Sequence, residues 1–453
     1  MEYADITFRV RTPLFLGKHS EVYKDEKVKI IKGITYDVFL KKAKLDANPF
    51  RGLLRWWFRA LHGWTEDMTS KESELFGSTD EASSFKIFVV NRTLDKSILK
   101  SDRGYCDYHE RHRPKGQKPF GIYPLPNSPY TDHGNYDGLA YFSKNLYSRE
   151  KNPNRINYHE YFDANGTNKF EIRIVAKKAC VFRKILMLIW LAFQFSGIGN
   201  RSRRCFGNLE IESNQENLIP NFTFKNSFQD STEYLKVLED NFDQIERIFE
   251  IDLQTSKAKS IVPCLNNSDF LCSFQGFRTW QEAIEQAGTA MQLFRTKSEP
   301  DYSHIRNISS ASISQRAAFG LPLLFRFSNP NTKVNLNMCF KKERFVNGQR
   351  IVSKDYTKLS SPAIASITKM GGNYFVQYLI LYLKYEQLLD EQNEVFIEDE
   401  NTGSRISVYN NALSQFVCHL ENPQITNTAI DTSHGTIYPI KRYKFCNITN
   451  RII

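Results

Sequence analysis

The order of short periodic segments in the first half of the chain most constrains its fold. Residues Asp5–Arg11 and Lys169–Lys177 alternate between apolar and polar side chains, which is typical of half-buried strands. A strongly apolar helix is predicted at Val181–Phe195. Further elements are predicted at three places: strands at Phe85–Val90 and Gly207–Glu212, and a helix near residues 49–62.

In chain order these segments read β-α-β-β-α-β, which is the order of the ferredoxin-like (RRM-like, βαββαβ) unit. The pattern predicts such a domain in residues 1–213. A long insertion, at about residues 91–168, separates the two middle strands and is rich in turn-forming residues. We expect a loop without regular structure there.

Residues 214–453 are predicted to form a second domain. An acidic stretch, Glu233–Glu250, is interpreted as a linker helix leading into it. The other predicted elements are helices at Arg278–Phe294 and Tyr374–Leu389, and strands at Leu321–Phe327 and Ala363–Thr368. The fold class is therefore α+β, compatible with a second, degenerate ferredoxin-like unit that carries extra C-terminal helices.

A glycine- and arginine-rich segment, Gly197–Gly207, directly follows the apolar helix. Glycine lets a backbone approach a ligand closely and expose its amides, and arginine matches phosphate in a bidentate way. We interpret the segment as a binding site for the phosphate backbone of a nucleic acid. Its candidate residues are Gly197, Gly199, Asn200, Arg201, Ser202, Arg203, Arg204 and Gly207. The alternative is that the arginines only neutralise the carbonyls at the end of the preceding helix.

A stripe of arginines runs along the helix predicted near residues 49–62, for which Asn48 is a suitable N-cap. Arg51, Arg55 and Arg59 share one face, and no acidic residue shares the helix. Like charges four residues apart repel, so the stripe predicts an anionic partner. That partner is either RNA phosphate or carboxylates from elsewhere in the fold.

Two adjacent tryptophans, Trp56 and Trp57, lie on the apolar side of the same helix. Their rings could stack on unpaired bases. Their position on the apolar arc favours packing in the core instead.

The bulk properties fit a globular protein with a polyanionic partner. The chain has 453 residues, a net charge of +11 and a sequence pI near 9.1. Its 8 cysteines form no Cys-x-x-Cys pair and no signal peptide is recognisable, so we expect a reduced, cytoplasmic protein. The longest apolar run, Ile185–Phe193, is too short to span a membrane.

One cluster in the insertion has residues that could act in catalysis. Cys106, His109, Glu110, His112 and Lys115 could supply a base, an acid and a positive charge for RNA cleavage without a metal. The same cluster lacks the second pair of ligands that a structural zinc site needs. We therefore expect a basic loop there, with no catalytic residue, no metal site and no cofactor.

The segment after the apolar helix reads Gly-x-Gly-Asn-Arg-Ser-Arg-Arg-x-Phe-Gly, which resembles the signature of the RAMP superfamily of CRISPR-associated proteins. Cys205 stands where that family usually has another glycine. Five other motifs resemble the first-subunit family of the type III-B Cmr effector complex. They are residues 12–17 (Thr-Pro-Leu-Phe-Leu-Gly), 50–61 (Phe-Arg-Gly-Leu-Leu-Arg-Trp-Trp-Phe-Arg-Ala-Leu), 75–78 (Leu-Phe-Gly-Ser), 318–322 (Ala-Phe-Gly-Leu-Pro) and Ser361-Pro362.

The resemblance implies a non-catalytic, RNA-binding subunit that caps the end of the complex holding the 3′ part of the guide RNA, in antiviral defence. The implied partners are CRISPR guide RNA, target RNA and the other RAMP subunits, with no membrane. One alternative is a RAMP endoribonuclease that processes CRISPR transcripts with His109 or His112. Another is a scaffold whose arginines bind acidic surfaces of neighbouring subunits and no RNA.

Overall fold

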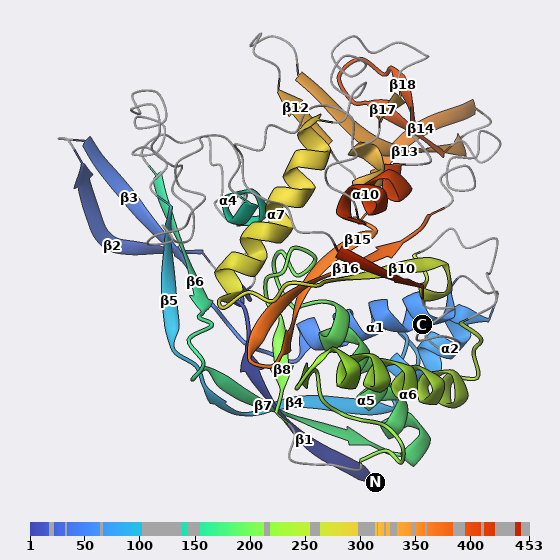
Figure 1. Ribbon diagram of the computed structural model, residues 1–453. Helices are drawn as coiled ribbons and strands as arrows, with labels where there is room; N and C mark the ends of the chain where they lie inside the picture. The colour runs from blue at the N-terminus through green and yellow to red at the C-terminus, as the bar shows by residue number, and fades with distance from the viewer. Residues whose placement is uncertain are drawn as a thin grey trace.

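In the residues that it describes, the computed structural model has a mixed α/β architecture with four sheets, each antiparallel in most or all of its pairings (Figure 1). It describes residues 1–17, 22–31, 34–63, 67–101, 138–143, 155–212, 218–253, 263–297, 313–314, 316–320, 323–326, 333–346, 349–357, 360–383, 395–408, 412–421 and 440–444.

The first half contains strands and helices at the following positions. The strands are β1 (Glu2–Val10), β2 (Val22–Ile31), β3 (Ile34–Lys41), β4 (Phe85–Thr93), β5 (Lys96–Ser101), β6 (Arg155–Phe162), β7 (Lys169–Ala176), β8 (Leu209–Ile211) and β9 (Ser227–Phe228). The helices are α1 (Asn48–His62), α2 (Met68–Phe76), α4 (Gly138–Ser143), α5 (Ala179–Phe195) and α6 (Ser231–Phe249).

The second half also contains both strands and helices. Its strands are β10 (Ser268–Ser273), β11 (Ile313–Ser314), β12 (Leu323–Arg326), β13 (Lys333–Val346), β14 (Gln349–Thr357), β15 (Ala363–Met370), β16 (Asn373–Leu381), β17 (Val395–Asp399), β18 (Arg405–Val408) and β19 (Ile440–Lys444). Its helices are α7 (Trp280–Lys297) and α10 (Ala412–Glu421), with short 3-10 turns η1 (Leu265–Asn267) and η2 (Arg316–Phe319).

The first sheet has the strand order β4-β7-β1-β8 and is antiparallel throughout. Alternate residues of β1, such as Ile6 and Phe8, are fully buried and pair across the sheet with Ile172 and Phe170 of β7. The alternation is therefore the pattern expected of a sheet with one covered face. The four strands and two helices predicted for this unit are confirmed.

From Ile185 onward, helix α5 is almost entirely apolar because it is buried on every side. It contacts β1, β7 and β8 of the first sheet and β15 and β16 of the second. Every residue from Ile185 to Phe195 is buried. Figure 1 shows α5 and its neighbours α1 and α6 above the first sheet, with the second sheet beyond them. A helix in this position has no solvent face to make polar.

The second sheet has the strand order β19-β10-β16-β15-β9. Strands β10, β15, β16 and β19 are antiparallel to their neighbours among these four, while β9 from the first half pairs with β15 in parallel. Helix α7 lies between β10 and β15 in the chain, and α10 between β16 and β19. These four strands and two helices repeat the order and pairing of the first unit, with β11–β14 and β17–β18 inserted.

The predicted helix at Tyr374–Leu389 is wrong over its first part, because Asn373–Leu381 is strand β16. Residues 384–394 lie outside the described part of the chain. A tight turn at Gly371 and Gly372, with φ of +55° and +82°, reverses the chain from β15 into β16. The strand lies inside its sheet and is buried from Val376 to Leu381, so its apolar run has no two-residue alternation to reveal it.

The insertion at residues 91–168 was expected to lack regular structure, and that expectation is wrong for its described residues. Strand β4 continues to Thr93, and β5, α4 and β6 are regular elements. Strands β5 and β6 join β2 and β3, which the sequence did not predict, in a sheet of order β2-β3-β6-β5. Pairing with β3, which is remote in sequence, stabilises strands that local pattern alone does not indicate.

Two helix predictions in the first half are confirmed with small differences. Helix α6 begins after Asp230, whose carboxylate accepts a hydrogen bond of 2.8 Å from the Glu233 amide, and it packs against α5. Helix α1 includes Asn48, and Ala47 holds the N-cap position without a side-chain hydrogen bond. Among the described residues, no helix combines the length and the hydropathy needed to cross a bilayer.

We expect His419 of α10 to make stability depend on pH. Its imidazole is 2% exposed and its Nε2 lies 3.2 Å from the Ala290 carbonyl oxygen. Burial lowers its pKa to about 4, from 6.5. Between these values the unfolded chain binds a proton that the folded chain does not, so this contribution is complete above pH ~6.5 and is lost as the pH falls toward ~4.

Chemical unfolding of the wild-type protein should therefore show a loss of about 2 kcal/mol between pH 7 and pH 5 that the variant His419→Phe does not show. Phenylalanine cannot titrate and keeps the ring contact with Phe294. Parallel stability curves for the two proteins would contradict the assignment.

Candidate nucleic-acid interface

The segment Gly197–Gly207 joins the two halves of the protein. The Asn200 amide donates to the Phe15 carbonyl oxygen at 2.9 Å on one side. The Cys205 amide donates to the Ala365 carbonyl oxygen of β15 at 2.9 Å on the other. The segment thus extends the second sheet by a parallel bridge while it remains attached to the residues that follow β1.

The glycines of this segment allow close packing of the chain on itself. A Cβ at Gly197 would lie 2.2 Å from the Phe206 carbonyl oxygen. A Cβ at Gly207, where φ is +68°, would lie 2.0 Å from the Ile198 carbonyl oxygen. No side chain fits at either position without moving backbone atoms.

The expectation that the glycines expose backbone amides to a ligand is wrong for most of the segment. Six of its amides donate to carbonyl oxygens of the protein, those of Gly197, Ile198, Asn200, Arg204, Cys205 and Gly207. The exposed part is the tip at Gly199 and Asn200, followed by partly exposed Arg201 and Ser202. Outside this tip, any contact of the segment with a phosphate depends on side chains.

Arg203 brings the segment and α1 together. Its guanidinium lies over the Trp56 ring, 4.6 Å from the centroid, and donates to the Ser361 carbonyl oxygen. Burial lowers the pKa of Arg203 to about 10, so the side chain stays charged at neutral pH. The two predicted sites are thus one continuous region, with a cation–π contact at its centre.

The other two arginines of the segment, Arg201 and Arg204, differ in their surroundings. The guanidinium of Arg204 lies over the Phe142 ring of α4, 5.9 Å from the centroid. Arg201 has a φ of +64°, a left-handed conformation that L residues adopt at a cost. Cys205 has the same φ, which glycine adopts without that cost, and is fully buried. Burial also raises the pKa of the Cys205 thiol well above its ordinary value.

The arginine stripe of α1 has intramolecular partners. Arg59 makes two hydrogen bonds to the Glu72 carboxylate of α2, at 2.5 and 2.7 Å, and Arg55 forms an ion pair with it at 3.1 Å. Arg51 donates to the Phe76 carbonyl oxygen at 3.3 Å, at the end of α2, where a cation is favourable. The structure therefore supplies the carboxylate from elsewhere in the fold, and contact of the stripe with RNA phosphate stays a prediction.

An exposed glycine marks the outer face of α1. A Cβ at Gly52 would have nothing within 4 Å, so no packing inside the protein requires a glycine there. Glycine inside a helix costs about 0.5–1 kcal/mol relative to alanine. Gly52 and Arg59 are exposed, and Trp56, whose ring carries the guanidinium of Arg203, is partly exposed.

The predicted core position of the tryptophans is confirmed for Trp57. Its ring is fully buried and its Nε1–H donates to the Ser196 hydroxyl at 3.2 Å, at the end of α5. Trp56 packs only partly against the core, because its other face carries Arg203.

The histidine-rich cluster of the insertion, Cys106 to Lys115, lies outside the described residues. Within the described ranges, no three His, Cys, Asp or Glu side chains are grouped so that they could hold a metal ion.

Known proteins match this chain over the region just described. Residues 7–210, which run from β1 to β8, match the model of the RAMP superfamily. This part of the chain thus has the RAMP superfamily signature, and the resemblance predicted from the sequence is confirmed.

More particularly, the chain is similar to Cmr1 subunits. It is 27% identical over 187 residues to the CRISPR system Cmr subunit Cmr1-2 of Pyrococcus furiosus, which covers 40% of this chain and 89% of the relative. It is 22% identical over 286 residues to Cmr1-1 of the same organism, which covers 62% and 70% of the two chains.

Two solved structures are also similar. The apo crystal structure of Cmr1 from Pyrococcus furiosus aligns with a TM-score of 0.49 and 17% identity, over 85% of this chain and 89% of that one. A chain of the type III-B Cmr-beta complex, bound to cognate target RNA and AMPPnP, aligns with a TM-score of 0.43 and 13% identity, over 84% and 96%.

Sequence reasoning missed three residues that shape this region. Glu72 holds two arginines of α1 and lies in α2, which was not predicted. The carbonyl oxygens of Pro13 and Phe15 accept hydrogen bonds from amides of the glycine-rich segment. From the sequence alone, the motif at residues 12–17 was used only as a family resemblance, and no contact was predicted for it. The one available signal was the Leu-Phe-Gly motif at residues 75–77, which follows Glu72 closely and ends the helix that carries it.

Substitution of three glycines by alanine separates their roles. Gly52→Ala should raise stability by about 0.5–1 kcal/mol, because its Cβ meets nothing. Gly166→Ala should lower it by about 1–2 kcal/mol, since its φ is +82° and the space is open. Gly199→Ala should cost more, because its φ is +91° and its Cβ would lie 2.5 Å from the Phe15 carbonyl oxygen.

Melting temperatures of the three variants and the wild type check this order. Gly166→Ala is the matched control, because Gly166 also has a positive φ but a Cβ there would contact no neighbouring atom. Equal melting temperatures for Gly166→Ala and Gly199→Ala would show that the glycine-rich segment does not pack against Phe15 as described.

Proposed function

We propose that this protein is a non-catalytic, RNA-binding subunit of a type III-B Cmr complex that acts in cytoplasmic antiviral defence. It caps the end of the complex that holds the 3′ part of the guide RNA and contacts guide and target RNA together with neighbouring RAMP subunits. The names of the relatives support a place in a Cmr system. The surface formed by α1 and the glycine-rich segment supports RNA binding.

Both halves are proposed to be ferredoxin-like units. In that fold the fourth strand pairs with the first, the first with the third, and the third with the second. The orders β8-β1-β7-β4 and β19-β10-β16-β15 both have this form, with antiparallel pairing at each step. The units differ in where they carry inserted strands.

The contact of Arg203 with Trp56 carries the RNA proposal. It places the arginines of the segment beside α1, where Gly52 is exposed and a Cβ on it would meet no atom within 4 Å in the described part of the chain. An arginine already stacked on an aromatic ring loses little further side-chain entropy when it binds a phosphate. The surface offers cations and stacking, which bind a nucleic acid without reading its sequence.

The proposal is tested by RNA affinity as a function of salt. Purified full-length protein is titrated into a fluorescein-labelled, unstructured single-stranded RNA, and the slope of log K against log salt is measured. Each phosphate contact in a single strand contributes about 0.7 to that slope. Arg201→Ala/Arg203→Ala/Arg204→Ala should weaken binding at least about tenfold and lower the slope by about 2.

The matched control removes the same charge from another exposed place. Lys177→Ala/Lys178→Ala/Arg183→Ala changes three exposed cations at the start of α5 and should leave affinity close to the wild type. Equal losses in the two triple variants would mean that only net charge matters. Unchanged RNA binding with loss of partner subunits in a pull-down would favour the scaffold alternative.

The variant Glu72→Gln tests whether the arginines of α1 bind RNA phosphate or serve only as partners of the Glu72 carboxylate. Removal of this carboxylate takes the ion pairs from Arg55 and Arg59, although Arg55 keeps its hydrogen bonds to the carbonyl oxygens of Phe76 and Gly77, and should lower stability by about 1 kcal/mol. If the stripe contacts RNA phosphate, the same change should raise RNA affinity severalfold. Lower or equal affinity would leave the stripe a purely structural element.

Cleavage is followed in the same reactions. The labelled RNA should stay intact, in accord with a non-catalytic subunit. Cutting that His109→Ala or His112→Ala abolishes while binding persists would replace this proposal with the endoribonuclease alternative.

A further inference from the structure

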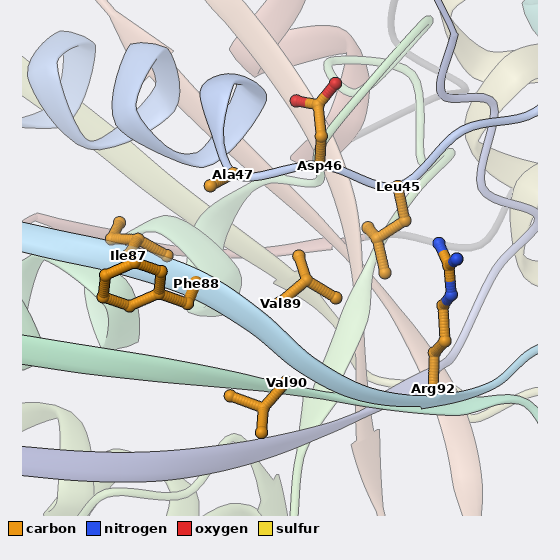
Figure 2. A pocket seen from close by; sticks show the side chains of 8 residues that line it. All are labelled: Leu45, Asp46, Ala47, Ile87, Phe88, Val89, Val90 and Arg92. Atoms are coloured by element: carbon orange, nitrogen blue, oxygen red, sulfur yellow. The ribbon is translucent and has the colours of Figure 1, made fainter.

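Strand β4 ends the first sheet and leaves one of its backbone edges unpaired among the described residues. A hollow of about 460 Å³ follows this edge. One wall is β4, from Ile87 to Val90 together with Arg92, and the other is residues 45–47, just before α1. Figure 2 shows the two walls facing each other across the hollow.

Large apolar side chains are exposed at this edge. Phe88 and Val90 of β4 are 48% and 45% exposed, and Tyr3, two strands away on the same uncovered face, is 65% exposed. Only five large hydrophobic residues are exposed in the described part of the chain, and these three are among them. Edges protected against pairing usually carry charged side chains at such positions.

The charges of the uncovered sheet face are largely paired. Arg173 of β7 forms a two-pronged ion pair with Asp5 of β1, with both contacts at 2.7 Å. Lys169 forms an ion pair with Glu212 at 2.7 Å, and Arg9 pairs with the same carboxylate. A face whose cations are already neutralised offers little to phosphate, so an RNA strand is a poor occupant here.

Two cations of β4 stand apart from these pairs. Lys86 and Arg92 are exposed, and in the described part of the chain neither makes an ion pair. Lys86 lies on the same face of the strand as Phe88, whereas the bulge between Val89 and Asn91 turns Arg92 to the opposite face, in register with Phe170 and toward the hollow. Six residues of strand separate them, or about 20 Å.

We propose that this edge of β4 binds an extended segment of another polypeptide, which adds a fifth strand to the sheet. The segment has alternating small β-branched residues, of which the outer ones cover Phe88 and Val90. It has an acidic residue near each end, one on its outer face opposite Lys86 and one on its inner face opposite Arg92. Its backbone pairs with β4, and its inner side chains enter the hollow beside residues 45–47. The register shift at Val89 and Asn91 limits the pairing to about six residues.

This inference adds a protein-docking site to the proposed function and does not require RNA. A protein partner is what a subunit of a complex needs, and the two surfaces use different residues. The docking edge uses the outer face of β4, while the RNA surface uses α1 and the glycine-rich segment.

The test uses the full-length protein and a synthetic fluorescein-labelled peptide of about six alternating valines and threonines with glutamate near both ends. N-methyl groups on its outer amides prevent self-association. We expect saturable binding with one peptide per chain, slower hydrogen exchange in residues 85–93, and at least about tenfold weaker binding of the same peptide with lysine ends.

The variant Lys86→Glu/Arg92→Glu should reverse this preference, so that the lysine-ended peptide binds better, and should leave RNA affinity unchanged. Absence of saturable binding, equal binding of the two peptides, or protection confined to other segments would each overturn the inference. Loss of RNA affinity in the charge-reversal variant would assign this face to RNA and also overturn it. Failure of RNA binding by the wild type with intact peptide binding would count against the proposed function alone.

Discussion

The junction between the two units depends on the buried guanidinium of Arg11, which is 3% exposed. It donates to the Ile367 carbonyl oxygen of β15 at 3.0 Å, and to the Asn226 carbonyl oxygen and the Ser227 hydroxyl at 2.8 and 2.9 Å. Burial lowers the pKa of Arg11, and the nearby Glu210 carboxylate acts against that shift. A buried cation is tolerated only with all its partners in place, because an uncompensated charge costs several kcal/mol. The hydrogen bonds of Arg11 therefore require both halves of the chain at once.

The same requirement explains why motifs far apart in sequence occur together. The carbonyl oxygens of Pro13 and Phe15 accept amides of the glycine-rich segment, and Ala365 pairs with its other side. Arg203 then reaches Ser361, the residue before the proline of the downstream motif. These motifs form a single junction in space, so a change in one leaves polar groups of the others unpaired in a buried region. Glycine is needed there for packing between backbones, which differs from the ligand-exposing role that its sequence suggests.

What could be predicted from the sequence follows from where each element is buried. Strand β1 has one covered face, so alternation at Ile6 and Phe8 predicted it, and α5 was long enough to be read as a helix. Strand β16 is buried on both faces, and its continuous apolar run was mistaken for a helix because periodicity is lost there. The sequence predicted the glycine-rich segment and the arginines of α1 as two separate candidate sites. It did not predict that Arg203 and Trp56 bring them into contact. That contact, like the pairing of Glu72 with Arg59, depends on tertiary placement that local pattern does not encode.

The placement of the candidate RNA surface on the junction has a mechanical consequence. The arginines that would bind phosphate lie on the segment that bridges to β15, and Arg203 itself bonds to the second half of the chain. A ligand held by these side chains would contact a segment that both units hold in place, so its binding energy would add to the stability of their docking. The buried network from Gln194 through Tyr234 to Gln377 ties α5 and α6 to β16 in the same way. The candidate RNA surface therefore lies on a segment whose position depends on both units.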